Sequence, residues 1–123
     1  MSTPPQPIQV RAGRGPAKST FTFDGQWLTI EHSAFTGFPG QRRINVAQIS
    51  EVHFKAPRPY LTNGWLGVVI VGDTNNHPVR GNRDAVKSPN YCVFTPKQQV
   101  DVERLRDVLL AAIASRYQAP PQV

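Results

Sequence analysis

The sequence predicts a mainly β fold: a strongly bent antiparallel sheet or open barrel of about seven strands, capped by one C-terminal α-helix. Two observations support this prediction. Short runs of alternating or continuous apolar residues recur over residues 8–95 and are separated by turns rich in Gly, Pro and Asn. From residue 96 onward, the apolar residues change from a period of two to the three- and four-residue spacing of a helix.

The clearest local feature is a β-hairpin over residues 20–33, TFTFDGQWLTIEHS. An Asp-Gly pair separates its two alternating runs, which is the strongest short-range signal for a hairpin. A period of two places Phe21 and Phe23 on one face of the first strand, and Leu28 and Ile30 on one face of the second.

Five further runs complete the seven strands. They are IQVRA (8–12), QRRINV (41–46), EVHFKA (51–56), WLGVVIVGD (65–73) and YCVFT (91–95). The near-continuous apolarity of residues 65–71 predicts a strand buried on both faces. Residues 13–19, GRGPAKS, are predicted to form a loop because two Gly and one Pro interrupt the pattern. The polar segment 73–90 is long for a connection inside a compact domain.

The C-terminal helix is predicted over residues 96–117. Thr95 is the expected N-cap, with Pro96 in the first helical position and Gln98 completing a capping box. One stripe is expected to pack on the sheet; it comprises Val102, Leu105, Val108, Leu109, Ala112 and Ile113. The folded domain is therefore predicted over residues 6–117, with disordered tails at 1–5 and 118–123.

The composition limits the functions to consider. The chain has 123 residues, which is the length of one ordinary domain. Its formal net charge of +6 favours acidic partners such as nucleic acid, anionic lipid or an acidic protein surface. Cys92 is the single cysteine, so an internal disulfide or a cysteine zinc cluster is excluded, and its apolar surroundings predict a buried, inert thiol. Because no apolar run reaches membrane-spanning length and the N-terminus lacks the features of a signal peptide, a cytoplasmic location is expected.

The order of these elements resembles the pleckstrin-homology-like superfold. Within it, the chain is similar to an actinobacterial domain-of-unknown-function family numbered 4429. The resemblance rests on FTFDGQWLTIEHS, RINVAQISEVHFKAP, WLGVVIVG and SPNYCVFTPKQQVDVERLRDVL, and it covers about residues 8–113. It implies a fold and associates no catalytic residues with it. Members often occur as repeated copies or beside a short C-terminal module, which this sequence does not show, so a free-standing accessory protein of an actinobacterium or its phage is expected.

No catalytic constellation is predicted. The three histidines lie on separate segments, and we interpret them as satisfied or exposed side chains; they are His32, His53 and His77. The alternative is that His32 meets Glu31, or His53 meets Glu51, across strands. Metal and nucleotide signatures are absent from the sequence, so neither a metal site nor a cofactor is expected.

A binding surface is the alternative to catalysis. If the fold is pleckstrin-homology-like, the connections after the first, third and sixth strands open at one end. They would bring together a basic and aromatic rim consisting of Arg14, Lys18, Phe35, Phe38, Arg42, Arg43, Arg80, Arg83 and Lys87. Phe35 and Phe38 would be apolar anchors among fixed cations, or would fold back to plug the barrel.

The function expected from the sequence is therefore a non-catalytic module that binds a protein partner through this rim. The alternatives are a small basic nucleic-acid-binding protein, with bases stacked on Phe, or a peripheral binder of anionic lipid. A homodimer formed by a strand edge or by the helix is also open. A phage protein would act in the cytoplasm of its host.

Overall fold

Seven β-strands and one long α-helix form the described part of the chain, which comprises residues 7–33, 40–58, 62–73 and 88–117 of the computed structural model. The strands are β1 (Ile8–Arg14), β2 (Ala17–Phe23), β3 (Trp27–His32), β4 (Gly40–Asn45), β5 (Ile49–Lys55), β6 (Gly64–Ile70) and β7 (Tyr91–Phe94). Two short 3-10 turns, η1 (Val46–Gln48) and η2 (Pro96–Gln98), precede β5 and α2 (Gln99–Tyr117). The predicted mainly β chain with one C-terminal helix is confirmed.

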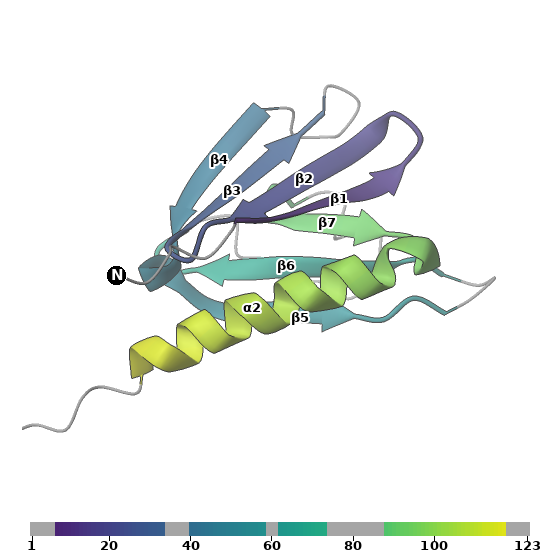
Figure 1. The fold of residues 1–123 in the computed structure, drawn as a ribbon. Coiled ribbons are helices and arrows are strands. Elements are labelled where there is room, and N and C mark those ends of the chain that lie inside the picture. Colours follow the sequence, from purple (N-terminus) through teal and green to yellow (C-terminus); the bar gives the residue numbers. More distant parts are fainter. Residues whose placement is uncertain (1–6, 34–39, 59–61, 74–87, 118–123) are drawn as a thin grey trace, which may run out of the picture.

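The strands form two antiparallel sheets (Figure 1). The first has the order β1-β2-β3-β4 and the second the order β5-β6-β7. The two sheets adjoin where β1 lies against β7, and α2 contacts β1 as well as β5 and β6. The sequence predicted one bent sheet or open barrel, whereas the described strands divide into two open sheets that the helix joins. Within these residues, no helix is long and apolar enough to cross a lipid bilayer.

Strand alternation gives each sheet one apolar face, and the two faces share a core. In the first sheet, Phe21 lies between Val10 of β1 and Ile30 of β3 in the same cross-strand row. The buried apolar side chains of this core are Val10, Ala12, Phe21, Phe23, Leu28, Ile30, Ile44, Val46, Ile49, Leu66, Val68, Ile70, Cys92, Phe94, Val102, Leu105, Leu109 and Ile113. Full burial of one large apolar side chain contributes about 1.5–3 kcal/mol, so this core is the main stabilising element.

The β6 strand is buried unevenly. Leu66, Val68 and Ile70 face the core, whereas Trp65 and Val69 on the opposite face are half-buried. The prediction of burial on both faces is therefore wrong for these two side chains, because the core is on one side of the sheet and the other side keeps partial contact with solvent.

The start of α2 is tied to the first sheet by a single side chain. The Gln98 amide oxygen accepts a hydrogen bond from the Thr95 N–H at 3.0 Å, as the capping-box prediction requires. It also accepts from the Gly13 N–H at 3.2 Å, while the Gln98 side-chain nitrogen donates to the Gly13 carbonyl at 3.1 Å. Gln98 thus satisfies the N-terminus of the helix and the backbone of β1 at the same time.

The core stripe of α2 is narrower than predicted. Val102, Leu105 and Leu109 are fully buried and Ile113 nearly so, as expected. Val108, which was placed in the same stripe, is 38% exposed. Val108 is rotated by about 100° from Leu109 around the helix axis, which places it at the margin of the face that Val102, Leu105 and Leu109 bury.

The predicted loop over residues 13–19 is a tight hairpin instead. β1 continues to Arg14 and β2 begins at Ala17, so that only Gly15 and Pro16 form the turn. Gly13 has φ +124° and Gly15 has φ +55°, conformations that L residues with side chains disfavour. The glycines that were interpreted as ending the strand therefore allow the two strands to pair up to the turn.

Gly13→Ala is expected to destabilise the fold by about 2 kcal/mol or more. A Cβ atom at this position would lie 2.2 Å from the Ala17 carbonyl oxygen, and the positive φ adds backbone strain. Gly15→Ala is the matched control, because it also has a positive φ but no atom within 4 Å of its Cβ position. Urea unfolding measures the free energy of unfolding of the two variants. Equal losses of stability would contradict the prediction, because they would show that the close contact with Ala17 adds no cost.

The buried thiol of Cys92 predicts a loss of stability at high pH. Burial raises its pKa from 9.0 to about 12. A group whose folded pKa is raised stabilises the protein below its unfolded pKa, and this contribution is lost as the pH rises toward the folded pKa. Between about pH 9 and pH 11, Cys92→Ala should therefore lose less stability than the parent, by on the order of 1–2 kcal/mol. Chemical denaturation at both pH values tests this, and parallel losses in the two proteins would contradict it.

Candidate functional site

The first and third connections of the chain meet through Ser33. The Ser33 hydroxyl donates to the Pro16 carbonyl at 2.8 Å and accepts from the Lys18 N–H at 3.2 Å. The Ser33 N–H donates to the Lys18 carbonyl at 3.0 Å. The residue that precedes segment 34–39 is thereby held against the β1–β2 turn.

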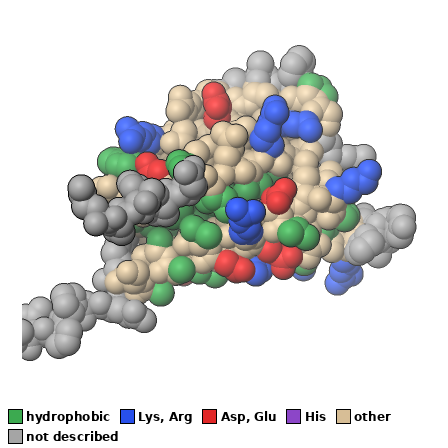
Figure 2. Space-filling view, viewed as in Figure 1, with side chains coloured by type: hydrophobic (Ala, Val, Ile, Leu, Met, Phe, Trp, Pro, Cys, Tyr) green, Lys and Arg blue, Asp and Glu red, His purple; other side chains and the backbone are tan. Residues whose placement is uncertain are grey.

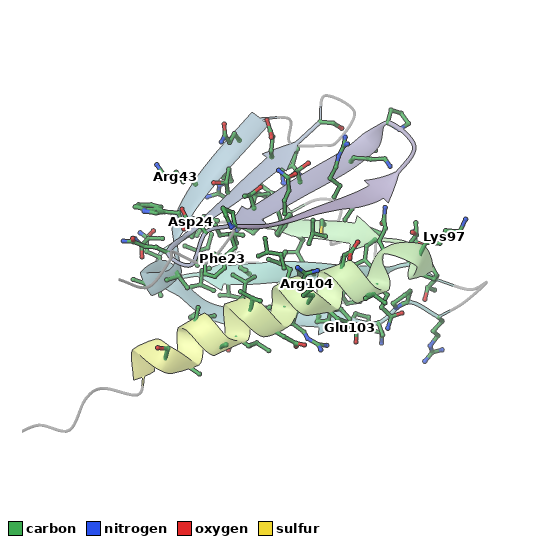
Figure 3. The ribbon with its side chains drawn as sticks, in the orientation of Figure 1. Phe23, Asp24, Arg43, Lys97, Glu103 and Arg104 are labelled. Carbon is green, nitrogen blue, oxygen red and sulfur yellow. The ribbon has the colours of Figure 1, made fainter. Side chains whose placement is uncertain are left out.

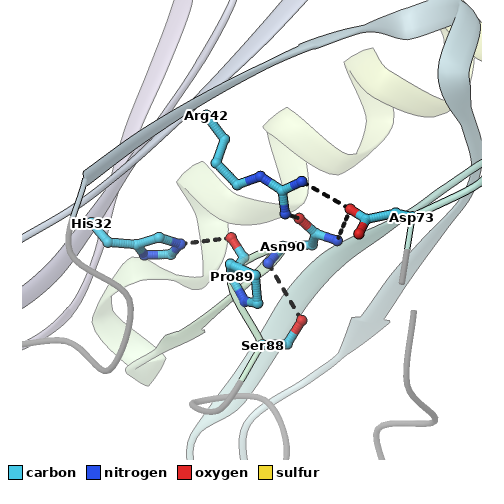
Figure 4. Close-up of polar contacts among 6 residues, drawn as sticks. All are labelled: His32, Arg42, Asp73, Ser88, Pro89 and Asn90. Atoms are coloured by element: carbon cyan, nitrogen blue, oxygen red, sulfur yellow. Dashed lines mark hydrogen bonds and ion pairs between the residues drawn. The ribbon is translucent and has the colours of Figure 1, made fainter. Parts of the chain in front are cut away.

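His32 then links the first sheet to the start of β7. Its Nε2 lies 2.7 Å from the Pro89 carbonyl oxygen (Figure 4). Its Nδ1 lies 2.6 Å from the Ser19 hydroxyl. Because a carbonyl oxygen can only accept, Nε2 carries the proton and donates to Pro89. Both His32 and Ser19 are buried, so the interpretation of His32 as a satisfied histidine is confirmed.

Arg42 makes the second link between the sheets. Its guanidinium donates to the side-chain oxygen of Asn90 and pairs with the Asp73 carboxylate at 2.9 Å (Figure 4). The Asn90 side-chain nitrogen donates to the same Asp73 oxygen at 3.2 Å, and the Asn90 N–H donates to the Ser88 hydroxyl. Asn90 is fully buried and the Asp73 side chain is 9% exposed, whereas the Arg42 side chain is 33% exposed. The guanidinium therefore reaches from a partly exposed position to two acceptors that are shielded from water, where its hydrogen bonds are stronger.

We call these contacts the inter-sheet network; its members are Ser19, His32, Arg42, Asp73, Asn90 and the carbonyl of Pro89. Among the residues described, no buried side-chain nitrogen or oxygen lacks a hydrogen bond. The network and Ser33 bring the ends of three connections together. We call this part of the molecule the loop end; it consists of residues 15–18, Ser33, Gly40, Asp73 and Ser88.

Arg43 points away from the inter-sheet network. It lies opposite Thr29 on the outer face of the first sheet, with its guanidinium 4.5 Å from the ring centroid of Trp27 (Figure 3). Asp24 begins the adjacent turn, where its carboxylate accepts from the N–H groups of Trp27 at 2.7 Å and Gln26 at 2.9 Å. These two hydrogen bonds, and to a smaller extent the charge of Arg43, lower the pKa of Asp24.

The predicted rim residues fall into three groups. Lys18 lies at the loop end, next to Ser33, and the backbone of Arg14 lies beside it in β1. Arg42 and Arg43 are adjacent in sequence but project from opposite faces of β4, so the structure does not bring them to one surface. The other predicted positions lie outside the described residues; they are Phe35, Phe38, Arg80, Arg83 and Lys87.

A second polar cluster lies on the outer face of the β5-β6-β7 sheet. The Nε2 of His53 is 2.8 Å from the Glu51 carboxylate, and its Nδ1 is 2.6 Å from the Tyr91 hydroxyl. Tyr91 reaches His53 by crossing Gly67, where a Cβ atom would lie 2.2 Å from the Tyr91 ring. Burial, followed by the charge of Glu51, raises the pKa of Tyr91, so the hydroxyl stays protonated at neutral pH.

The interpretation of the histidines as satisfied or exposed side chains is confirmed for His53, which is partly exposed and pairs with Glu51. Both residues lie on β5, so the alternative of a pairing across strands is wrong for them. Within residues 7–33, 40–58, 62–73 and 88–117, no group of three or more His, Cys, Asp or Glu side chains is arranged to hold a metal ion.

Sequence reasoning missed the structural role of Arg42, Asp73 and Asn90. One signal was present: Arg42 precedes the buried Ile44 by two residues, so strand alternation places both on the same inward face. No comparable signal marked Asp73 or Asn90, because both lie at the ends of a long polar segment and their partner is distant in the sequence.

Arg42→Met is expected to destabilise the fold by about 1–3 kcal/mol, because it removes the charged donor from the buried side chains of Asn90 and Asp73. Arg43→Met is the matched control. It loses the stacking on Trp27, which contributes at most about 1 kcal/mol at an exposed site, and the weaker charge interaction with the exposed Asp24. Urea unfolding measures both, and a loss from Arg42→Met no larger than that from Arg43→Met would show that the inter-sheet network adds little.

Comparison with known proteins assigns a family. Neither the curated proteins nor the solved structures include a match to this chain. The family described as domain of unknown function (DUF4429) matches residues 21–110, a range that runs from β2 to within α2 and includes every member of the inter-sheet network except Ser19. The chain therefore belongs to the DUF4429 family.

Proposed function

We propose that the protein is a non-catalytic interaction module that binds a protein partner at the loop end. The observation that carries the proposal is the convergence of three connections. The hydrogen bonds of Ser33 hold the start of segment 34–39 on the β1–β2 turn. The contacts of Arg42 and His32 hold the residues on either side of segment 74–87 against the first sheet.

Segments anchored at both ends on a rigid scaffold are where proteins most often carry recognition residues. The two segments contain the side chains that suit a protein interface. Phe35 and Phe38 supply apolar anchors, and Arg80, Arg83 and Lys87 supply charge for acidic groups around them. The net charge of +6 favours a partner with an acidic surface.

The described cations have different roles in this proposal. Lys18, at the loop end, contributes to binding directly. Arg42 is a positioning residue, because its guanidinium is engaged by Asn90 and Asp73. Arg43 lies on the outer face of the first sheet, where its stack on Trp27 would border the interface rather than form its centre.

The proposal includes the pleckstrin-homology-like superfold. Support comes from the arrangement of four and three antiparallel strands, the contact between β1 and β7, and the C-terminal helix that contacts both sheets. We place the protein in an actinobacterium or its phage on the basis of the sequence resemblance described above.

A pull-down tests this function. The tagged full-length chain is exposed to lysate of the organism that encodes it, with and without nuclease, beside the double variant Phe35→Ala/Phe38→Ala. Leu110→Ala is the matched control, because it truncates a side chain on α2 that is 44% exposed, away from the loop end. A discrete protein that survives nuclease, remains with Leu110→Ala and disappears with the double variant is the expected result.

Other outcomes overturn the proposal. Capture that is lost on nuclease treatment would assign the protein to nucleic-acid binding, and its affinity should then fall steeply with salt as counterions are released. Binding to vesicles containing phosphatidylserine, without a captured protein, would assign it to anionic lipid. Equal capture by the parent and by the double variant would show that Phe35 and Phe38 do not contribute to the interface.

A further inference from the structure

The outward face of α2 carries apolar side chains between charged ones. Val100 is 76% exposed and Val108 38% exposed, on the side of the helix away from the core residues Val102, Leu105 and Leu109. A shallow groove follows this face; its lining residues are Val100, Glu103, Arg104, Asp107, Val108 and Ala111. Figure 2 shows hydrophobic side chains between acidic and basic ones along the helix, and Figure 3 shows Glu103 and Arg104 on it.

Four residues of this face form a stripe that we call the outer stripe: Val100, Arg104, Asp107 and Ala111. Their spacing of four, three and four residues keeps them on one side of a helix, as in the contact seam of a coiled coil. The stripe has apolar residues at its two ends and opposite charges at its centre.

The charged side chains at the centre of the outer stripe, Arg104 and Asp107, can still form ion pairs with another molecule. The Arg104 side chain makes no ion pair or hydrogen bond with any other described residue. Asp107 is contacted by Arg106 through Nε and an Nη atom, both at 2.9 Å, and both contacts use Oδ1. The second carboxylate oxygen of Asp107 therefore has no partner among the residues described.

The outer stripe is complementary to itself when one copy is reversed. A two-fold axis passing between residues 105 and 106 would place Arg104 beside Asp107 of a second copy, and Asp107 beside Arg104 of that copy. The same axis would place Val100 against Ala111 at both ends. A parallel pairing would instead set Arg104 against Arg104, which is unfavourable. The charge order therefore favours one occupant and one orientation.

We propose that the protein forms a symmetric homodimer in which the α2 helices of two copies pack antiparallel along the outer stripe. Two reciprocal ion pairs between Arg104 and Asp107 set the register, and Val100 and Ala111 supply apolar contact. A single helix face is smaller than a standard interface, so the dimer is expected at micromolar concentrations or above. The outer stripe shares no residue with the loop end, so this proposal can fail while the proposed function holds.

A charge-exchange experiment on the full-length chain tests the homodimer. Sedimentation equilibrium is measured for the parent, Arg104→Asp, Asp107→Arg, and an equal mixture of the two variants. Each variant alone would face like charges across the axis and should dimerise at least about tenfold more weakly than the parent. In the mixture, every pair of charges that meets across the axis is opposite in sign, because one variant carries two carboxylates in the outer stripe and the other carries two guanidinium groups. A heterodimer should therefore form.

Asp101→Arg is the matched control, because it makes the same change of charge on the exposed side of α2 outside the outer stripe and should leave dimerisation within about twofold. Circular dichroism confirms that each variant is folded. The proposal is overturned if the parent remains monomeric at several hundred micromolar, if the single variants dimerise as well as the parent, or if their mixture forms no heterodimer.

Discussion

The contact of Arg42 with Asn90 and Asp73 is the constraint on which the arrangement of the loop end depends. Apolar packing in the core is strong but has no direction, and it would tolerate small shifts of one sheet against the other. A hydrogen bond between a guanidinium and two buried polar side chains has direction, because Asn90 and Asp73 lose their water on folding and must regain a partner. The inter-sheet network therefore sets where the chain enters and leaves segment 74–87.

The attachment of α2 shows a similar division between apolar packing and directional hydrogen bonds. Leu105 and Leu109 hold the helix to the sheets by burial, whereas Gln98 sets its starting point by bonding both Thr95 and Gly13. The helix leaves one face to solvent and the loop end occupies another part of the molecule. The protein thus offers two separate surfaces, which allows self-association and partner binding to be independent properties.

Much of the local structure was predictable because it depends on neighbours in sequence. Three short-range patterns are confirmed by the structure: the hairpin at Asp24-Gly25, the shared buried face of Phe21 and Phe23, and the capping box of Thr95 and Gln98. The capping box lies at the 3-10 turn η2, directly before α2. The predictions that proved wrong depended on patterns that fit two different local structures. Gly13 was interpreted as a strand breaker, but its positive φ permits the strand to continue. Val108 follows Leu105 at helical spacing, which predicts it in the core stripe, yet it is exposed.

The sequence by itself determined the mainly β class, the C-terminal helix and the buried state of Cys92, since periodicity and apolarity report local structure directly. Only the tertiary structure decided which partners these two arginines meet, Asp73 and Asn90 for Arg42 and the Trp27 ring for Arg43. The partners of Arg42 lie 31 and 48 residues away along the chain. Contacts between residues so far apart in the sequence depend on how the two sheets pack. The order of apolar and polar residues along the chain does not predict that packing.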